Sequence, residues 1–213
     1  MTRFITFEGG DGSGKTTQLK ALESHLTGRG KSCTTTREPG GTSLGKLIRQ
    51  VLLEVGEQTI ASPTELFLYL ADRAQHIQEI IRPAIEQGKI VLCDRYTDST
   101  LAYQGYGRGI DLELLRELNA IASQGITPDL TLLFDCPVEI GLSRTAQRLF
   151  RATTAGNRED RFEREKVEFH ERVRAGFLEL ARTEPKRFCV IDASRSVEEV
   201  FHQVRKIVDQ KLA

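Results

Sequence analysis

The sequence FEGGDGSGKTT, residues 7–17, decides the fold, because Gly9 to Thr16 match the pattern G-x-x-x-x-G-K-[ST]. A short β-prone run, residues 3–6, precedes this stretch, and leucines at helical spacing follow it over residues 19–26. The glycines therefore lie at a turn between a strand and a helix, which is the setting that the pattern requires. A glycine-rich turn that binds nothing is the alternative, and the order of strand, loop and helix argues against it.

The chemistry of this loop follows from its residue types. Glycines let successive backbone N–H groups point inward as a nest for phosphate oxygens, and the start of the helix adds its positive dipole end. The ammonium of Lys15 can reach β- and γ-phosphates, and the hydroxyl of Thr16 can bind Mg²⁺. We therefore predict that nucleotide phosphates bind to Gly10, Asp11, Gly12, Ser13, Gly14, Lys15, Thr16 and Thr17.

The overall composition is that of an ordinary globular protein, with 39% hydrophobic and 28% charged residues among 213. Thirty basic and thirty acidic residues balance, so the net charge favours neither nucleic acid nor a membrane as a partner. No apolar run approaches the ~20 residues of a membrane span, and the N-terminus lacks an apolar signal core. We expect a single cytoplasmic domain over residues 1–213.

Short apolar or β-branched runs alternate with helical patterns along the chain. This alternation predicts an α/β fold with a parallel sheet covered by helices on both faces. The four cysteines fall in or beside the runs and form no C-x-x-C pair, which favours buried, reduced thiols over a metal site or a disulfide. The runs lie near residues 3–7, 32–36, 90–93, 130–135 and 188–191.

Local signals mark several boundaries between elements. Residues 62–65 and 196–199 both have the form S-x-x-E, a capping box that predicts the start of a helix. Residues 103–109 are glycine-rich and predict a functional turn rather than a helix. Residues 152–160, ATTAGNRED, are small and polar and predict a mobile surface loop.

Charged residues follow two of the predicted strands. Asp94 and Arg95 come directly after one strand, and REPGGT, residues 37–42, comes after another. Because the carboxyl ends of parallel strands face the ligand crevice, Asp94 can act on Mg²⁺ or its waters, while Arg95 and Arg37 can bind phosphate. From these residues alone, a structural Asp–Arg pair and a simple turn that contains an arginine remain the alternatives.

An arginine cluster lies in the C-terminal half of the chain. Arg144, Arg148 and Arg151 share one helical face, and three more arginines follow over residues 158–164. Without acidic partners one turn earlier the three repel one another, so an anion such as a transferred phosphoryl group would stabilise them. A solvated basic face is an equally open alternative, whereas a nucleic-acid groove lacks the interleaved aromatic residues that would support it.

A pocket for a planar ring can be assembled from side chains of two segments. Phe67 also fits a core-facing helical pattern with Leu66 and Leu70, so core packing is the alternative for it. The histidines at positions 25, 76, 170 and 202 have no metal-ligand spacing, and we interpret them as surface or helix residues. The candidate pocket residues are Phe67, Arg73, Ser99, Thr100, Tyr103 and Gln104.

Taken together, these motifs resemble the thymidylate kinase family, in family order and over nearly the whole chain. The resemblance implies transfer of the γ-phosphoryl group of ATP to dTMP with Mg²⁺, and it also implies a homodimer. The fold it implies is that of P-loop nucleoside monophosphate kinases, with a five-stranded parallel sheet flanked by helices. The matching segments are EGGDGSGKTTQ (8–18), REPGGT (37–42), DRYTDSTLAYQG (94–105), PDLTLLFD (128–135), an arginine-bearing lid at about 144–164 and IDAS (191–194).

Carried over position by position, the resemblance also implies roles in binding dTMP. Arg37 and Arg95 would hold its phosphate, Phe67 would stack on thymine, and Arg73 would donate to a ring carbonyl. Tyr103 would lie under the sugar and disfavour a 2′-hydroxyl. The implied dTMP site is Asp11 (toward the sugar 3′-hydroxyl or the metal), Arg37, Phe67, Arg73, Arg95, Ser99, Thr100, Tyr103 and Gln104, and the implied metal ligands are Thr16 and Asp94.

One departure bears on catalysis. Some family members carry an arginine inside the phosphate loop, where this chain has Ser13, and the resemblance then implies that the lid supplies the catalytic arginines. The alternatives are a kinase for another nucleoside monophosphate and a nucleotide switch, although the sequence lacks the N-K-x-D motif of a GTPase switch. The catalytic residues predicted here are Lys15, Arg95, Arg148, Arg151 and Arg158.

Overall fold

The protein forms a five-stranded parallel sheet in strand order β2-β3-β1-β4-β5. The structure is a computed structural model that describes residues 3–53, 60–153 and 165–212. None of the helices in these ranges is long and apolar enough to cross a membrane. The elements are β1 (Phe4–Glu8), α1 (Lys15–Gly28), β2 (Cys33–Arg37), α2 (Ser43–Leu53), α3 (Ser62–His76), η1 (Ile77–Ile81), α4 (Arg82–Glu86), β3 (Ile90–Asp94), α5 (Thr97–Thr100), η2 (Leu101–Gly107), α6 (Leu112–Ala122), β4 (Leu130–Asp135), α7 (Val138–Thr153), α8 (Val167–Thr183), β5 (Phe188–Asp192) and α9 (Val197–Leu212).

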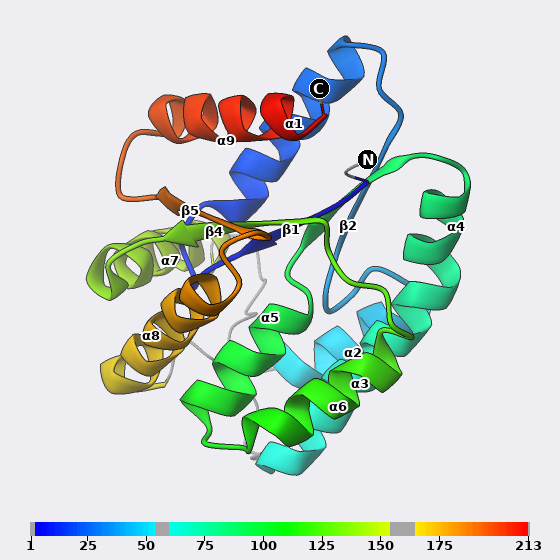
Figure 1. Cartoon of the computed structure of the whole chain (residues 1–213). Helices are drawn as coiled ribbons and strands as arrows, with labels where there is room; N and C mark the ends of the chain where they lie inside the picture. Colours follow the sequence, from blue (N-terminus) through cyan, green and yellow to red (C-terminus); the bar gives the residue numbers. More distant parts are fainter. Residues whose placement is uncertain (1–2, 54–59, 154–164, 213) are drawn as a thin grey trace.

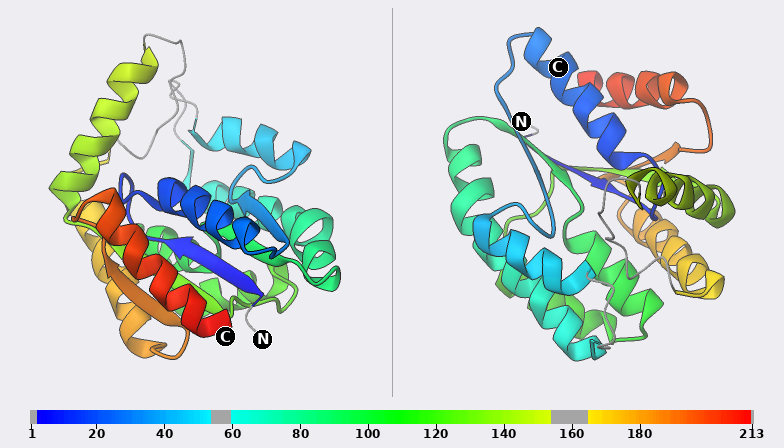
Figure 2. Two further views of the ribbon diagram at one scale, coloured as in Figure 1. Left: turned by 90° about the horizontal axis from the view of Figure 1, so that it is seen from above. Right: turned by 180° about the vertical axis from the view of Figure 1, so that it is seen from behind.

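Helices cover both faces of the sheet, as the sequence predicts (Figure 1). Successive side chains of a strand point to opposite faces. In β1, Ile5 and Phe7 join the core beneath α1 and α9, whereas Phe4 joins a second core cluster with Ile77 and Ile81. Helices α1 and α9 pack against each other over the first face (Figures 1 and 2). α4 packs against β3, α8 packs against β4 and β5, and α2, α3 and α6 pack against one another or against η2.

The carboxyl ends of all five strands meet at one edge of the sheet, because the strands are parallel. Each strand ends in a charged residue there, and no strand interior carries one. Burying these charges in the middle of a sheet would be unfavourable, whereas at the edge they can bind ligands or one another. The five residues are Glu8, Arg37, Asp94, Asp135 and Asp192.

The two predicted capping boxes have different outcomes. Before α9, Glu199 accepts from the backbone N–H of Ser196, and the hydroxyl of Ser196 accepts from the N–H of Glu199. At α3 the helix begins at Ser62, as predicted, but the capping box does not form, because the N-cap is Ala61 and no side chain caps it. The carboxylate of Glu65 is instead buried against Gln104 and Arg108. Glu65 therefore accepts hydrogen bonds from distant side chains instead of capping the end of its own helix.

The glycine-rich segment predicted as a turn is helical. α5 continues into η2, a π-helix, and the following Arg108 caps it. The glycines allow another element to approach closely: a β-carbon at Gly107 would lie 2.6 Å from the ring of Phe169 on α8. Close packing of η2 and α8 thus outweighs the low helix propensity of glycine at this position.

Candidate active site

A cavity of about 620 Å³ opens where the strands end. Its walls bring together most of the residues that the sequence analysis singles out, although these residues come from separate segments. The phosphate loop contributes residues 11–17 to the lining. The other predicted residues that line the cavity are Arg37, Arg73, Asp94, Arg95, Ser99, Thr100, Tyr103 and Gln104.

The phosphate loop needs glycine at defined positions. Gly12 has φ 71° and Gly14 has φ 87°, which is the left-handed region that other residues avoid. A side chain at Gly12 would also collide with the carbonyl oxygen of Gly141 in α7. The loop therefore adopts its shape while packed directly on α7, and α1 begins immediately after it at Lys15.

Lys15 lies inside the curve of the loop. Its Nζ donates to the carbonyl oxygens of Gly9 at 3.0 Å and Gly10 at 2.7 Å, and to Oγ of Ser13 at 3.2 Å. Burial, together with the positive charge of Arg95, lowers the pKa of Lys15 to about 8. An ammonium with this pKa is mostly charged at pH 7 and loses its proton as the pH rises through about 8, and phosphate oxygens would stabilise the charged form.

Thr16 and Asp94 offer oxygen ligands of the kind that Mg²⁺ prefers. Oγ1 of Thr16 donates to Oδ2 of Asp94 at 2.6 Å, and both residues line the cavity. The described part of the chain contains no cluster of three His, Cys, Asp or Glu side chains that would enclose a metal by itself. A single hydroxyl and a single carboxylate nevertheless fit Mg²⁺, which keeps several waters and takes phosphate oxygens as its other ligands.

Arg95 has both an unusual backbone and a crowded side chain. Its φ is 68°, which is strained for a residue other than glycine. The guanidinium donates to Gly9 O, to Oγ of Ser99, to Oδ1 of Asp11 at 2.7 Å and to the hydroxyl of Tyr103 at 3.0 Å. It also stacks 4.9 Å from the centre of the Tyr103 ring. Five contacts fix this cation at the junction of the phosphate loop and η2.

Asp11 is the acidic counterpart of Arg95. Its second oxygen, Oδ2, accepts from the hydroxyl of Tyr103 at 2.8 Å. Burial opposes ionisation of this carboxyl, but Arg95 and then Lys15 outweigh that effect and lower the pKa of Asp11. The carboxylate is therefore charged at neutral pH and is held between Arg95 and Tyr103.

Glu8 holds in place two residues that follow Arg95 in the chain, a role that could not be predicted from the sequence. Its carboxylate is fully buried and accepts from the backbone N–H of Tyr96 at 2.7 Å and from Oγ of Ser99 at 2.6 Å. These contacts flank Arg95 and hold the chain in its strained turn. Burial, followed by the negative charge of Asp98, raises the pKa of Glu8 to about 8.

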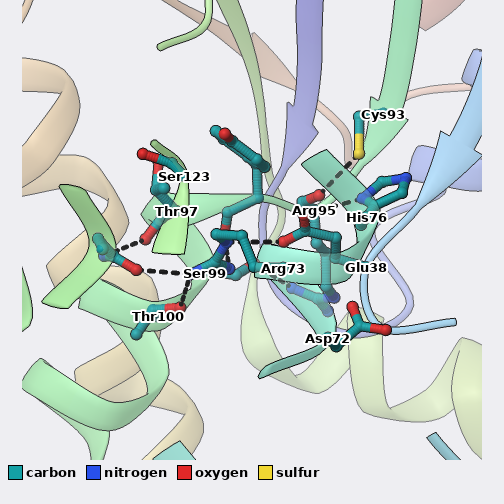
Figure 3. A network of polar contacts seen from close by, with 12 residues as sticks. Glu38, Asp72, Arg73, His76, Cys93, Arg95, Thr97, Ser99, Thr100 and Ser123 are labelled. Carbon is teal, nitrogen blue, oxygen red and sulfur yellow. Dashed lines mark hydrogen bonds and ion pairs between the residues drawn. The ribbon is translucent and has the colours of Figure 1, made fainter. Parts of the chain in front are cut away.

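Arg73 is the centre of a buried polar network (Figure 3). Nε donates to Glu38 at 2.8 Å, one amino group donates to Thr100 at 2.9 Å and to Asn119, and the other donates to the carbonyl of Tyr96 at 3.0 Å. Burial opposes the positive charge, but Glu38 outweighs it and the pKa of Arg73 is raised. The guanidinium is thus fixed at the cavity wall with four of its five N–H groups engaged.

His76 and Asp72, both on α3, lie beside this network (Figure 3). His76 lies on a helix, as expected, but it is fully buried, with Nδ1 2.9 Å from Glu38 and Nε2 2.6 Å from Thr36. Asp72 accepts from the backbone N–H of Gly40 at 3.0 Å, and burial followed by the charge of Glu38 raises the pKa of Asp72 to about 6. The turn after β2, which contains a cis peptide bond at Glu38–Pro39, is therefore tied to α3.

Phe67 is the predicted pocket residue that the structure separates from the others. Its side chain is 61% exposed and does not line the cavity, so it belongs neither to the pocket nor to the core. Tyr69 lines the cavity instead. Tyr69 lies one helical turn before Arg73, so the two side chains share a face of α3. This four-residue spacing from Arg73 could have identified Tyr69 as the aromatic residue of the pocket from the sequence.

Arg37 and Arg49 line the rim of the cavity near the turn after β2. Arg37 is exposed, and in the described part of the chain its side chain makes no hydrogen bond or ion pair, which leaves its donors available. Arg49, on α2, donates to the carbonyl of Pro39 at 3.1 Å and was not singled out from the sequence. Two arginines thus flank the cavity beside Arg73 and Arg95.

The predicted lid arginines are only partly described. Arg144 lines the cavity and donates to the carbonyl of Ala193 at 2.9 Å. Arg148 and Arg151 lie on the last turns of α7, where the structure describes the backbone alone. Arg158, and most of the predicted surface loop, lie outside the described residues.

This arrangement defines the class of protein. A phosphate loop after β1, strand order β2-β3-β1-β4-β5 and a second group of cations in the same cavity are the features of a P-loop nucleoside monophosphate kinase. The hydroxyl and carboxylate of Thr16 and Asp94 complete a site suited to a magnesium-bound triphosphate.

Comparisons with known proteins identify the particular family. The family model "Thymidylate kinase" matches residues 7–204. Curated thymidylate kinases from Desulfovibrio desulfuricans and Geotalea uraniireducens are 53% and 51% identical over 98% and 100% of this chain, and over 96% and 99% of their own. The crystal structure of thymidylate kinase from Ehrlichia chaffeensis superposes with a TM-score of 0.78 at 35% identity over 98% of both chains. The chain belongs to the thymidylate kinase family.

Proposed function

We propose that the protein transfers the γ-phosphoryl group of ATP to dTMP, giving dTDP and ADP. The observation that carries this proposal is one cavity that contains both the phosphate-loop cation Lys15 and a second set of cations, Arg37, Arg73 and Arg95. A hydrolase or a switch needs only the first set. Two cationic sites in one cavity suit two nucleotides whose phosphates meet, and the family membership supports dTMP as the second nucleotide.

In this mechanism the loop residues 10–17 hold the phosphates of ATP. Bound Mg²⁺ would be held by Thr16 and Asp94, and it would neutralise charge on the β- and γ-phosphates. Lys15 exchanges its contacts with the loop carbonyls for contacts with phosphate oxygens, and Arg95 holds the acceptor phosphate for in-line attack. No general base is required, because the acceptor phosphate is already ionised at neutral pH.

The acceptor dTMP would be held at three points. Arg37 and Arg95 bind its phosphate, and Tyr103 with Asp11 lies beside its sugar. We assign the ring stacking that was first predicted for Phe67 to Tyr69 instead, because Tyr69 lines the cavity. The remaining residues that would surround the base are Arg73, Ser99, Thr100 and Gln104.

The lid arginines Arg148, Arg151 and Arg158 remain our candidates for stabilising the transferred phosphoryl group. Replacing Arg148 and Arg151 together with alanine should lower kcat more than it raises the KM for dTMP, because a contact made mainly in the transition state acts on kcat. The matched control is Arg182→Ala, on an exposed surface of α8 where Arg182 pairs with Glu179. A change confined to KM would assign the pair to ground-state binding.

A panel of acceptors tests the proposed function. The purified protein is incubated with ATP and Mg²⁺ and, in turn, with dTMP, dUMP, dCMP, dGMP, AMP and GMP, and formation of each diphosphate is measured. We expect the highest kcat/KM for dTMP. A protein that phosphorylates dCMP or GMP equally well is a different nucleoside monophosphate kinase, and one that only hydrolyses ATP is not a kinase of this group.

We also propose a homodimer that uses the outer face of α2, α3 and α6. α3 packs between the other two helices, and the three lie side by side (Figure 1). These helices carry large apolar side chains that are 47% to 74% exposed, and apolar residues so concentrated on a surface favour a self-complementary interface. A cytoplasmic location and the absence of a nucleic-acid partner remain predictions from the sequence. The exposed residues are Leu44, Leu47, Val51, Phe67, Leu114 and Ile121.

A further inference from the structure

Gln104, on η2, is a cavity residue whose side chain has a fixed orientation. Its residue surface is only 2% exposed, and it lines the cavity. Its amide nitrogen Nε2 donates to Oε1 of Glu65 at 2.8 Å in a buried hydrogen bond. In the described part of the chain, its carbonyl oxygen Oε1 makes no hydrogen bond, so this oxygen is the atom left to meet a ligand.

Glu65 can only accept a hydrogen bond from Gln104. It is fully buried on the first turn of α3, and Arg108 approaches it through Nε at 3.4 Å and through an amino group at 3.3 Å. Although burial opposes the charge of Arg108, Glu65 outweighs it and raises the pKa of Arg108, so the two form an ion pair. An ionised carboxylate has no proton to donate. The amide of Gln104 must therefore turn its NH₂ toward Glu65 and its oxygen away.

The cavity consequently offers a base one acceptor and one donor of fixed polarity. The acceptor is the carbonyl oxygen of Gln104, and the donor is the remaining N–H of Arg73, whose other four are engaged within the protein. Thymine presents N3–H as a donor and O4 as an acceptor, which complements this pair. Cytosine presents N3 as an acceptor and its 4-amino group as a donor, which is the reverse.

We propose that Glu65 is a positioning residue that holds Gln104 as a hydrogen-bond acceptor and thereby excludes cytosine from the acceptor site. An amide that is free to rotate would adapt to either ring by exchanging its oxygen and its NH₂. The buried carboxylate prevents that exchange, so cytosine leaves polar groups unpaired in a buried site. This inference rests on the proposed function, because it assumes that the base of the acceptor nucleotide lies beside Gln104 and Arg73.

The test is Glu65→Gln, which keeps the size of the side chain but can both donate and accept. Gln104 can then present either end, so the ratio of kcat/KM for dTMP to kcat/KM for dCMP should fall by about tenfold or more. The KM for ATP should stay unchanged. Glu179→Gln, on the exposed surface of α8, is the matched control and should leave the ratio as in the wild type. If Glu65 has only a structural role, Glu65→Gln should lower kcat/KM for dTMP and for dCMP by the same factor. An unchanged ratio of the two values therefore overturns the proposal.

The double variant Glu65→Gln, Gln104→Glu gives a reciprocal test. It exchanges the carboxylate and the amide, so that position 104 again presents only acceptor oxygens and the preference for dTMP over dCMP should return. A ratio as low as that of the single variant counts against the proposed polarity.

A third measurement uses the wild-type protein and does not depend on the folding of either variant. The side-chain ¹⁵NH₂ signals of Gln104, assigned with Gln104→Leu, should exchange slowly with solvent because the nitrogen faces Glu65. Exchange as fast as that of an exposed glutamine overturns the inference. This signal reports the orientation of Gln104 whether or not dTMP is the substrate, so the acceptor panel and the NMR result can fail independently.

Discussion

At the scale of single residues, the environment moves the pKa values of Lys15, Glu8 and Asp72 toward neutrality, whereas it moves those of Asp11 and Arg73 away from it. Lys15 is the clearest case, because burial and Arg95 lower its pKa to about 8. The charged form is the one that binds phosphate, so it is lost as the pH rises through this value. A lysine on the surface would keep its charge to beyond pH 10.

The first prediction concerns the pH dependence that Lys15 imposes. We expect kcat/KM for ATP to fall as the pH rises above about 8, because this parameter reports groups of the free enzyme. For kcat the fall should occur at higher pH, since bound phosphate stabilises the ammonium. Steady-state rates from pH 6 to 10 measure kcat/KM for ATP and kcat. As a separate test, Lys15→Ala should abolish turnover without changing the circular dichroism spectrum. Near-normal turnover in Lys15→Ala would remove Lys15 from the mechanism.

The second prediction concerns Glu8 and stability. Its pKa is raised to about 8 in the folded protein from 4.5, so the folded state keeps a proton that the unfolded state loses as the pH rises between these values. The free energy of unfolding should therefore decrease over this range, by at most about 1.4 kcal/mol per pH unit for one proton. Glu8→Gln cannot ionise and should have a shallower slope. Urea unfolding at a series of pH values measures it, and parallel slopes would exclude Glu8 as the cause.

At this scale the sequence could predict which residue types belong to the site, but not how deeply each side chain is buried or which charges surround it. The phosphate loop has a fixed spacing, so its place between β1 and α1 could be predicted, and the predicted strands end within one residue of the observed ones. Glu8 was missed because nothing in its neighbours in the sequence indicates that it lies below Arg95, which is 87 positions later in the chain. Contacts between distant segments determine the pKa values and the polarity of the site, and these do not appear as local patterns.

At the scale of elements, the direction of side chains on a helix decides which residues reach the cavity. Tyr69 and Arg73 are separated by about 40° around the axis of α3, whereas Phe67 and Arg73 are separated by about 120°. The sequence predicted the helix and its apolar character, but not the face that would be covered by the cavity. The prediction of Phe67 depended on the aromatic residue type and neglected this angle.

The third prediction therefore compares the two aromatic residues of α3. Tyr69→Ala should raise the KM for dTMP about tenfold, since stacking of a base on an aromatic ring contributes about 1–3 kcal/mol. Tyr69→Phe keeps the ring and should be close to the wild type. Phe67→Ala should leave the KM for dTMP unchanged, because Phe67 does not line the cavity. If Phe67→Ala raises the KM and Tyr69→Ala does not, the original assignment is correct.

At the scale of the whole molecule, the distribution of apolar surface indicates how the chain assembles. Exposed apolar residues are concentrated on α2, α3 and α6, and Phe67 is among them. Phe67 does not line the cavity, and a second copy of the chain that covers this face would explain why Phe67 is exposed in the monomer. The amphipathic patterns of these helices could be read from the sequence, but exposure on their outer side only became evident when their packing was known.

The fourth prediction concerns this face. Sedimentation should give twice the chain mass of 23.9 kDa for the wild type. Leu47→Glu combined with Ile121→Glu should give the monomer, because two charges would be buried without partners in each half of the interface. Val190→Glu, at an exposed position on β5, is the control and should stay dimeric. A monomeric wild type, or a double variant that remains a dimer, would exclude this interface.

The order of residues around the cavity has a consequence for the synthesis of the protein. Every side chain that we assign to dTMP comes from the first 104 residues, whereas Ala193, Arg195 and Val197 complete the lining next to the phosphate loop. A nascent chain leaves the ribosome from its N-terminus, so the acceptor half emerges well before the donor half is complete. Ribosome-bound chains that stop before β5 should therefore bind ATP more weakly than the full-length protein.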